Sequence, residues 1–291
     1  MKYVEFKECV LEVINTRIDD GEEVKLDKVT KNNNITLDSI TIIRPGYNVF
    51  PTTYLNYYYE AYLNGKTIEE IVEEIFYVSE SYTGTKEYFN NILEDYDAIK
   101  DNIVCKLINT KLNKNLLNLI PFKPFLDLAI VAYCVMDKGD DGCCGIIITN
   151  EILKGWDINA DDMIEEAIDN TPKFLGETLF PVTNLLDKND PFYASEDIPL
   201  YILTNQYHTN GAICILDEFI LDDLSNELES DLIIIPASVH EVMIAPKYMG
   251  PNTDELDMLI NQINKNDLQP QDILSDHSYT YLRASKKIVM N

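Results

Sequence analysis

Ser238, His240 and Glu241 are the residues whose types and spacing come closest to a catalytic arrangement. In an extended segment, residues two apart point to the same face, so Ser238 and His240 would lie side by side. A histidine beside a serine can take the hydroxyl proton and make the serine a nucleophile. Asp276 and His277, later in the chain, would complete such a site. We therefore take Ser238, His240 and Glu241 as candidate catalytic residues.

Other features of the same segment favour a structural role for it. The segment lacks the strand–turn–helix pattern that presents a serine nucleophile in hydrolases. Two side chains on one strand also point in parallel and do not converge. The sequence therefore favours a strand-end role for Ser238 and His240, with hydrolytic catalysis as the alternative. His208 lies in a polar turn, where histidine is common.

A turn that follows Met136 contains several metal-binding residue types. Calcium loops place oxygen ligands at alternating positions and end on a distal glutamate, a register that this turn lacks. Its cysteines, Cys143 and Cys144, are adjacent, whereas zinc sites usually separate two cysteines by two residues. We predict a solvated hairpin turn, with no bound metal and no cofactor. The acidic members of the turn are Asp137, Asp140 and Asp141.

The charge of the chain is strongly unbalanced. Of 291 residues, 50 are acidic and 23 are Lys or Arg, which gives a formal net charge of −27. Two thirds of this excess lies between residues 137 and 231, where 22 carboxylates face only 4 lysines. Such a field attracts basic surfaces, and it also keeps a protein in solution. A binding role and a solubilising role therefore both remain open.

Two segments of this acidic stretch are predicted to be helices with a solvated acidic face. In residues 160–170 the apolar residues recur at helical spacing, and the acidic residues fall outside that stripe. Residues 217–226 are predicted to form a second acidic helix. We predict that these helices bind a basic protein surface. The expected binding residues are Asp161, Asp162, Glu165, Glu166, Asp169, Asp222 and Asp223.

Composition argues against nucleic acid and membranes as direct partners. The chain has no glycine-rich phosphate loop and no basic patch interleaved with aromatic residues. No apolar run approaches the ~18 residues that span a membrane. The start of the chain has no charged-then-apolar leader, so the six cysteines are expected to be reduced. We expect a cytoplasmic protein, and the sequence leaves its oligomeric state open.

Hydrophobic periodicity predicts an α+β fold in two parts that pack together. Residues 1–118 are predicted to be mainly helical with a short strand pair, and residues 119–291 to be an α+β part with antiparallel hairpins. The unbroken apolar run Phe125–Met136 predicts a central buried strand, paired with residues 145–149. Further strands are predicted within 22–44 and at 200–204, 212–216, 232–235, 242–245 and 279–282. Further helices are predicted at 2–18, 86–118, and after Asn252 or Thr253.

Several short phrases along the chain point to a family. They are Pro51–Leu55, Ile120–Val131, Ile148–Asn150 with Trp156, Leu203–Asn205 with Gly211 and Ala212, Ile235–Val242, and Leu274–Asp276. Together they resemble DUF5688, a family of unknown function, over about residues 40–285. The resemblance lends no catalytic residue. It implies an accessory role on mobile elements of gut bacteria, including anti-defence. Ala237 stands where the family pattern has a second serine, which weakens serine chemistry further.

Two functional hypotheses from different classes follow. In the first, the chain is a non-enzymatic acidic interaction protein, such as a mobile-element or phage anti-defence factor. It would bind a basic, nucleic-acid-binding surface of a host protein. In the second, the chain is an intracellular enzyme or small-ligand binder centred on Ser238 and His240. Geometry separates the two hypotheses, because the second requires those side chains to converge in a cleft.

Overall fold

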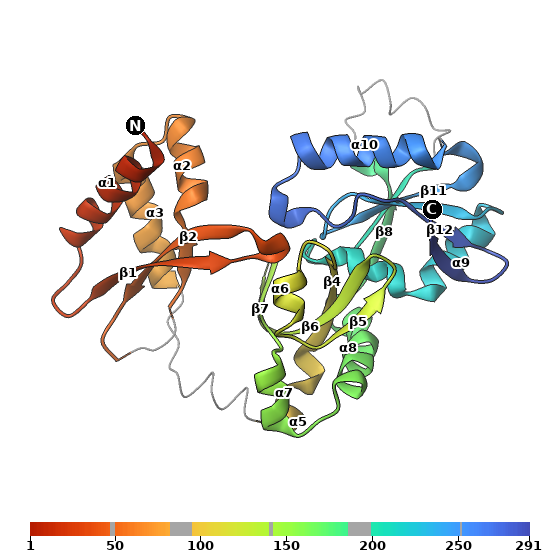
Figure 1. The fold of residues 1–291 in the computed structure, drawn as a ribbon, viewed down its shortest axis with the longest axis horizontal. Coiled ribbons are helices and arrows are strands. Elements are labelled where there is room, and N and C mark those ends of the chain that lie inside the picture. Colours follow the sequence, from red (N-terminus) through yellow and green to blue (C-terminus); the bar gives the residue numbers. More distant parts are fainter. Residues whose placement is uncertain (47–49, 82–94, 140–141, 186–198, 251) are drawn as a thin grey trace. The chain divides into compact units, whose positions relative to one another are not determined.

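The computed structural model describes residues 1–46, 50–81, 95–139, 142–185, 199–250 and 252–291. The chain forms two units (Figure 1). Unit 1 comprises residues 1–31 and 35–95, and unit 2 comprises residues 32–34 and 96–291. Both units combine helices with antiparallel sheets, so the predicted α+β class is confirmed.

Unit 1 is a three-stranded antiparallel sheet with three helices on one of its faces (Figure 1). Helix α1 turns Phe6, Val10 and Ile14 toward the sheet, where Ile40 and Ile42 complete the core. This spacing of three or four residues is that of an amphipathic helix. The elements are α1 (Tyr3–Asn15), β1 (Glu23–Thr30), β2 (Thr36–Ile43), β3 (Thr52–Tyr54), α2 (Leu55–Leu63) and α3 (Ile68–Ser81).

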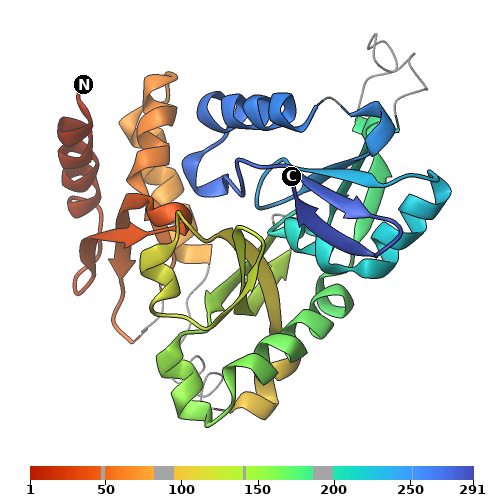
Figure 2. The same cartoon turned by 45° about the vertical axis from the view of Figure 1, so that its right-hand side comes forward.

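Unit 2 contains a sheet built around one long buried strand, β6 (Leu128–Gly139). Strands β4 (Ile103–Asn109), β5 (Phe122–Phe125) and β7 (Gly142–Ile147) all pair antiparallel with it. Residues 128–135 of β6 are buried, as predicted for the central strand, but the strand begins at Leu128 and not at Phe125, which ends β5 instead. Helix α8 (Ala160–Leu175) packs against β4, β5 and β6 (Figure 2).

The first difference from the sequence prediction is β4. Residues 86–118 were predicted to be helical, but residues 103–109 form a strand that pairs with β6. Polar and apolar residues alternate little in this segment, because both of its faces are buried. A short apolar run fits a strand or a helix equally well. This pairing places β4 in unit 2, so the units divide near residue 95 and not near residue 118. Residues 86–94 lie outside the described residues.

The second sheet of unit 2 has six antiparallel strands in the order β13-β12-β10-β11-β9-β8. Helix α10 covers one face, where Leu256 and Ile260 contact Ile233. Helix α9 lies on the other face (Figures 1 and 2). The strands are β8 (Thr178–Pro181), β9 (Tyr201–Thr204), β10 (Leu232–Pro236), β11 (Val242–Pro246), β12 (Tyr279–Leu282) and β13 (Lys287–Met290).

The predicted strand at 212–216 is wrong. Gly211–Leu216 is a short 3₁₀ helix, η4, and residues 211–215 are buried. A Cβ atom on Gly211 would lie 2.5 Å from the carbonyl oxygen of His240 and 2.7 Å from the backbone nitrogen of Asn205. Helix η4 is therefore tightly packed beside β9, and its residues are apolar because they are buried.

The remaining helices are short except for α9 and α10. Among the described helices, none has both the length and the apolar character that a membrane span requires. The remaining helices are η1 (Asn32–Asn34), α5 (Tyr96–Ile99), η2 (Lys100–Asn102), α6 (Lys114–Leu117), α7 (Asn150–Trp156), η3 (Val182–Leu185), α9 (Glu218–Glu227), η5 (Lys247–Met249), α10 (Thr253–Asn266) and η6 (Pro270–Asp272).

Candidate functional site

The Ser238–Glu241 segment is the loop that joins β10 to β11. The backbone N–H of Ser238 donates to the carbonyl oxygen of Glu241 at 3.1 Å. The backbone N–H of His240 donates to Ser238 Oγ at 3.0 Å. The serine oxygen therefore stabilises the loop, as side chains commonly do in turns. It is bonded to the backbone of His240 and not to the imidazole ring, so the two residues do not form a nucleophile–base pair here.

The imidazole ring of His240 also bonds to the fold around it. Its Nδ1 accepts the backbone N–H of Asn210 at 3.2 Å, and its Nε2 lies 3.5 Å from Asp272 Oδ1. Because Nδ1 accepts, a neutral ring carries its proton on Nε2, which faces the carboxylate. No described serine or threonine hydroxyl is hydrogen-bonded to this ring. The ring holds the loop, the turn at Asn210 and η6 together.

The residues suggested as further members of the site do not join it. Ser275 Oγ accepts the backbone N–H of His277 at 3.0 Å, a second Ser-X-His turn. His277 Nδ1 lies 3.1 Å from Asp257 Oδ2, and Asp276 Oδ1 accepts from Asn264. His240 and His277 thus have separate carboxylate partners, Asp272 and Asp257. Within the described residues, no hydrogen bond connects the His240 ring and its partners with the His277 ring and its partners.

We expect Ser238→Ala with His240→Ala to lower the free energy of unfolding without removing biological activity. The double variant leaves buried N–H groups without acceptors, which costs about 1–3 kcal/mol. Urea unfolding measures the loss, and the capture of a basic partner measures activity. Ser238→Thr, which keeps the hydroxyl, is the matched control. A folded double variant with no remaining activity would instead support the enzyme hypothesis.

Helix α8 carries the acidic face that the sequence predicts. Asn159 caps it, because Asn159 Oδ1 accepts the backbone N–H groups of Asp161 and Asp162 at 2.8 and 3.2 Å. Met163 and Ala167 are buried on the side that packs against the sheet. The exposed residues on the other side are Asp161, Asp162, Glu165, Glu166 and Asp169.

Two of these five carboxylates already have partners. Glu165 Oε1 lies 2.5 Å from Lys123 Nζ. Glu166 accepts the Tyr96 hydroxyl at 2.6 Å; burial, together with this bond, raises the pKa of Tyr96. Among the described residues, no ion pair involves the other three. We call these three, Asp161, Asp162 and Asp169, the α8 acidic face.

The two predicted residues of α9 differ from each other. Asp223 is exposed. Asp222 is partly buried, and its Oδ2 accepts from Lys286 Nζ at 2.6 Å. The sequence prediction assigned the same binding role to both residues, but Lys286, which comes from the turn after β12, distinguishes them. Asp222 is therefore already neutralised and Asp223 is free of such a partner among the described residues.

A hollow of about 470 Å³ lies where the end of α8 meets η4 and the start of α9. Its carboxyl groups are those of Asp169, Glu177, Asp217 and Glu218. Thr171 and apolar side chains form the rest of the wall, and Lys173 is the one basic residue among its described lining. The apolar lining residues are Ile168, Pro172, Ile213, Leu216 and Phe219. The predictions from the sequence did not include this hollow, although an acidic helix cap followed within two residues by Phe219 is a signal that the sequence contains.

Glu177 and Asp217 form a carboxyl pair in this hollow. Burial, and then the hydrogen bond and charge of Asp217, raise the pKa of Glu177 to about 7. Asp217 Oδ1 accepts the N–H groups of Phe219 and Ile220 at 2.7 and 3.2 Å, as a helix N-cap does. Asp217 therefore acts as an acceptor in the cap, and the raised pKa belongs to Glu177.

Glu177→Gln is expected to change how stability depends on pH. An unfolded glutamate loses its proton near pH 4.5, whereas Glu177 in the folded chain keeps it to about pH 7. Between these values the folded state binds more protons, so wild-type stability falls as pH rises through this window. Glutamine cannot ionise, so above pH 7 the free energy of unfolding of the variant should exceed that of wild type by on the order of 1 kcal/mol, after discounting for solvent screening.

Urea unfolding near pH 5 and near pH 8 tests this expectation. Glu255→Gln, at an exposed position of α10, is the control and should show no such gain. The same wild-type-to-variant difference at both pH values would contradict the buried carboxyl pair.

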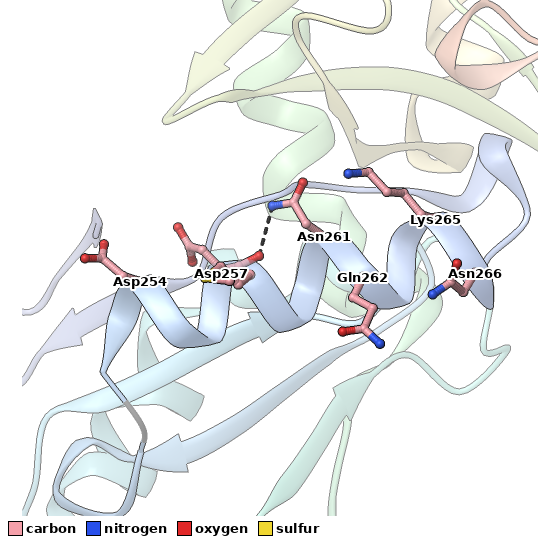
Figure 3. A pocket seen from close by; sticks show the side chains of 7 residues that line it. Asp254, Asp257, Asn261, Gln262, Lys265 and Asn266 are labelled. Atoms are coloured by element: carbon pink, nitrogen blue, oxygen red, sulfur yellow. Dashed lines mark hydrogen bonds between the residues drawn. The ribbon is translucent and has the colours of Figure 1, made fainter.

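Another depression follows the exposed side of α10 (Figure 3). Its polar side chains come from one helix and point in separate directions, and Asn261 Nδ2 donates back to the carbonyl oxygen of Asp257 at 2.9 Å. Among the described residues, no group of three or more His, Cys, Asp or Glu could hold a metal ion. The side chains drawn with labels are Asp254, Asp257, Asn261, Gln262, Lys265 and Asn266.

None of the described cysteines has an exposed side chain. Burial raises the pKa of Cys105, Cys134 and Cys214, which keeps these thiols protonated. Cys9 and Cys143 are partly buried, and all five are free of disulfide bonds. The side chains of Asp137 and Cys144, and residues 140 and 141, lie outside the described residues, so the solvated hairpin turn stays a prediction.

Comparison with known proteins places the chain in one family. The model of a family of unknown function, DUF5688, matches residues 3–283, so the chain belongs to that family. The match also covers the region on which the sequence resemblance rests. No curated protein and no solved structure matches the chain.

Proposed function

We propose that this member of the DUF5688 family is a cytoplasmic, non-enzymatic interaction protein that binds a basic protein surface. The binding surface is the α8 acidic face. The observation that supports the proposal is that Asp161, Asp162 and Asp169 are exposed on a capped helix without an ion pair to any described residue. Nearby acidic residues, by contrast, have local partners such as Lys123 and Lys286.

The rigidity of α8 makes this surface suitable for binding. Met163, Ile164 and Ala167 are each 1% exposed and fix the helix on the sheet, so the carboxylates hold their spacing. Carboxylates in fixed positions resemble a row of phosphate charges. The proposed partner is therefore a host protein whose basic surface ordinarily holds nucleic acid. A mobile-element, anti-defence role is part of this proposal. The negative field of the chain would speed the encounter.

The enzyme hypothesis has less support. Ser238 Oγ bonds to the His240 backbone, and the His240 ring bonds to Asn210. His277 and Asp276 have separate partners. These residues therefore do not pair a nucleophile with its base, and the cavity of about 170 Å³ that Asp276 and His277 line includes neither Ser238 nor His240.

Neutralising the α8 acidic face is expected to reduce partner capture at least tenfold. The variant is Asp161→Asn, Asp162→Asn and Asp169→Asn, which keeps the shape of each side chain. Glu165 and Glu166 are left unchanged because they hold Lys123 and Tyr96. Capture of proteins from a host lysate on immobilised chain measures the effect. Added DNA should release the captured proteins, because it competes for the same basic surface.

The control removes three charges from another helix of the same unit. Asp254→Asn, Glu255→Gln and Asp267→Asn act on the first turn and the end of α10, as the test variant acts on α8. Wild-type capture should weaken with salt, since the screening length falls from ~10 Å at 0.1 M to ~3 Å at 1 M. Equal capture by test variant and control, unchanged by salt, would leave the acidity as a solubility feature.

A further inference from the structure

We infer that the hollow beside α8 is an anchor site that takes an arginine side chain of the basic partner, between the Phe219 ring and the carboxyl groups of Glu177 and Asp217. This inference rests on the proposed function, because it assumes a basic protein partner. It adds the residue type that the partner presents and the place where that residue inserts.

The hollow is continuous with the α8 acidic face. Asp169 belongs to that face and also lines the hollow. A volume of about 470 Å³ lies in the range of pockets that hold small organic groups, about 300–1,000 Å³. A segment that lies along α8 can therefore place one long side chain in the hollow.

The polar groups around the hollow are mostly hydrogen-bond acceptors. Asp169, Asp217 and Glu218 supply carboxylate oxygens. Pro172 has no backbone N–H, so the carbonyl oxygen of Ile168 lacks its helical donor. Arginine is complementary to such a wall, because its guanidinium has five N–H donors, carries no acceptor and is always charged. Planar donors also pair well with carboxylates, which accept two parallel bonds.

Phe219 supports arginine over lysine. It stands in the first turn of α9, lines the hollow and is 82% exposed, the largest exposed fraction among the described large apolar residues. A guanidinium stacks on an aromatic face and is more weakly hydrated than an ammonium group. The exposed ring therefore gains more from arginine than from a lysine of equal charge.

The charge of the hollow changes near neutral pH. Glu177 faces Asp217 of the α9 cap and lies near the Cys214 thiol of η4. Asp169 and Lys173 of α8, and Glu218 of α9, line the same hollow. Among the described lining residues none is a histidine. When Glu177 loses its proton, the hollow gains a negative charge, so arginine should bind more tightly near pH 8 than near pH 6.

Two blocked synthetic peptides of equal length test the inference, one with alternating Arg and Gly and the other with Lys in place of Arg. Fluorescence anisotropy at low salt and near pH 8 measures both. Wild type should bind the arginine peptide at least fivefold more tightly than the lysine peptide. Phe219→Ala and Glu177→Gln should each reduce that preference to less than twofold. The exposed-site controls Tyr248→Ala and Glu255→Gln should leave it unchanged.

Each outcome supports or overturns the inference. Loss of the preference in the two hollow variants, with loss of the pH effect in Glu177→Gln, supports it. Equal binding of the two peptides by wild type, hollow variants that behave like the controls, or no binding of the arginine peptide would overturn it. The proposed function is judged separately, by lysate capture with Asp161→Asn and Asp162→Asn, which leave every residue that lines the hollow unchanged.

Discussion

Asp127→Ala is expected to lower the free energy of unfolding by about 3 kcal/mol or more, since it removes the acceptor of two buried hydroxyl donors at about 1–3 kcal/mol each. Asp127 Oδ2 accepts the Ser275 hydroxyl and Oδ1 accepts the Tyr279 hydroxyl, both at 2.7 Å. Ser275 and Tyr279 are each 0% exposed. Asp127 lies between β5 and β6, whereas Tyr279 is on β12, so these bonds join the two sheets of unit 2.

Two tyrosines on β12 provide a matched test of this network by urea unfolding. Tyr279→Phe removes a hydroxyl that donates to Asp127 and should cost about 1–3 kcal/mol. Tyr281 is on the same strand and is 1% exposed, but its hydroxyl has no hydrogen-bond partner among the described residues. Tyr281→Phe should therefore be neutral or slightly stabilising. Equal losses for the two variants would contradict the account of the Asp127 network.

Gly211→Ala is expected to lower the free energy of unfolding by about 1–3 kcal/mol or more, because it overpacks a buried position. The new Cβ would stand 2.5 Å from the carbonyl oxygen of His240 and 2.7 Å from the nitrogen of Asn205. Both neighbours are backbone atoms, and Thr204 Oγ1 fixes that same carbonyl by donating to it at 2.8 Å. Rotation of a side chain therefore cannot relieve the clash.

Gly155→Ala is the control for this substitution. Gly155 lies in α7, and a Cβ there would meet no atom within 4 Å. Alanine is a better helix former than glycine, so Gly155→Ala should raise the free energy of unfolding by about 0.5–1 kcal/mol. Thermal unfolding of the two variants measures the contrast. A stable Gly211→Ala protein would contradict the packing of η4 against the β10–β11 loop.

The parts of the fold that depend on local pattern could be predicted from the sequence. Strand β6 is an unbroken apolar run, which is typical of a strand buried on both faces. Helix α8 has an apolar stripe and a good N-cap in Asn159, and both features occur within one short segment. The exposure of Asp161 and Asp169 follows from the same periodicity.

The parts that depend on distant neighbours could not be predicted in this way. Ile103–Asn109 is a strand because it pairs with β6, a partner that its own sequence does not reveal. Gly211–Leu216 is apolar because it is buried, and burial alone does not separate a strand from a 3₁₀ helix. Tertiary contacts therefore determine the secondary structure of both segments.

The candidate site likewise has features that the local sequence predicts and features that depend on distant residues. The α8 acidic face could be read from spacing, but the salt bridge of Asp222 could not, because Lys286 is far away in the sequence. The hollow has no local signal for the burial of Glu177, which follows from its meeting with Asp217. The sequence favoured a structural role for Ser238, but the bond between its Oγ and the backbone N–H of His240 could not be predicted from it.

Amide hydrogen exchange with the arginine peptide bound tests the central claim most directly, because it locates the binding surface without any variant. The peptide should slow exchange in residues 160–175 and 211–220, which contain α8, η4 and the start of α9. Protection of these segments should fall as salt rises. Protection centred on residues 237–241, or spread evenly over other acidic segments such as α10, would contradict the account.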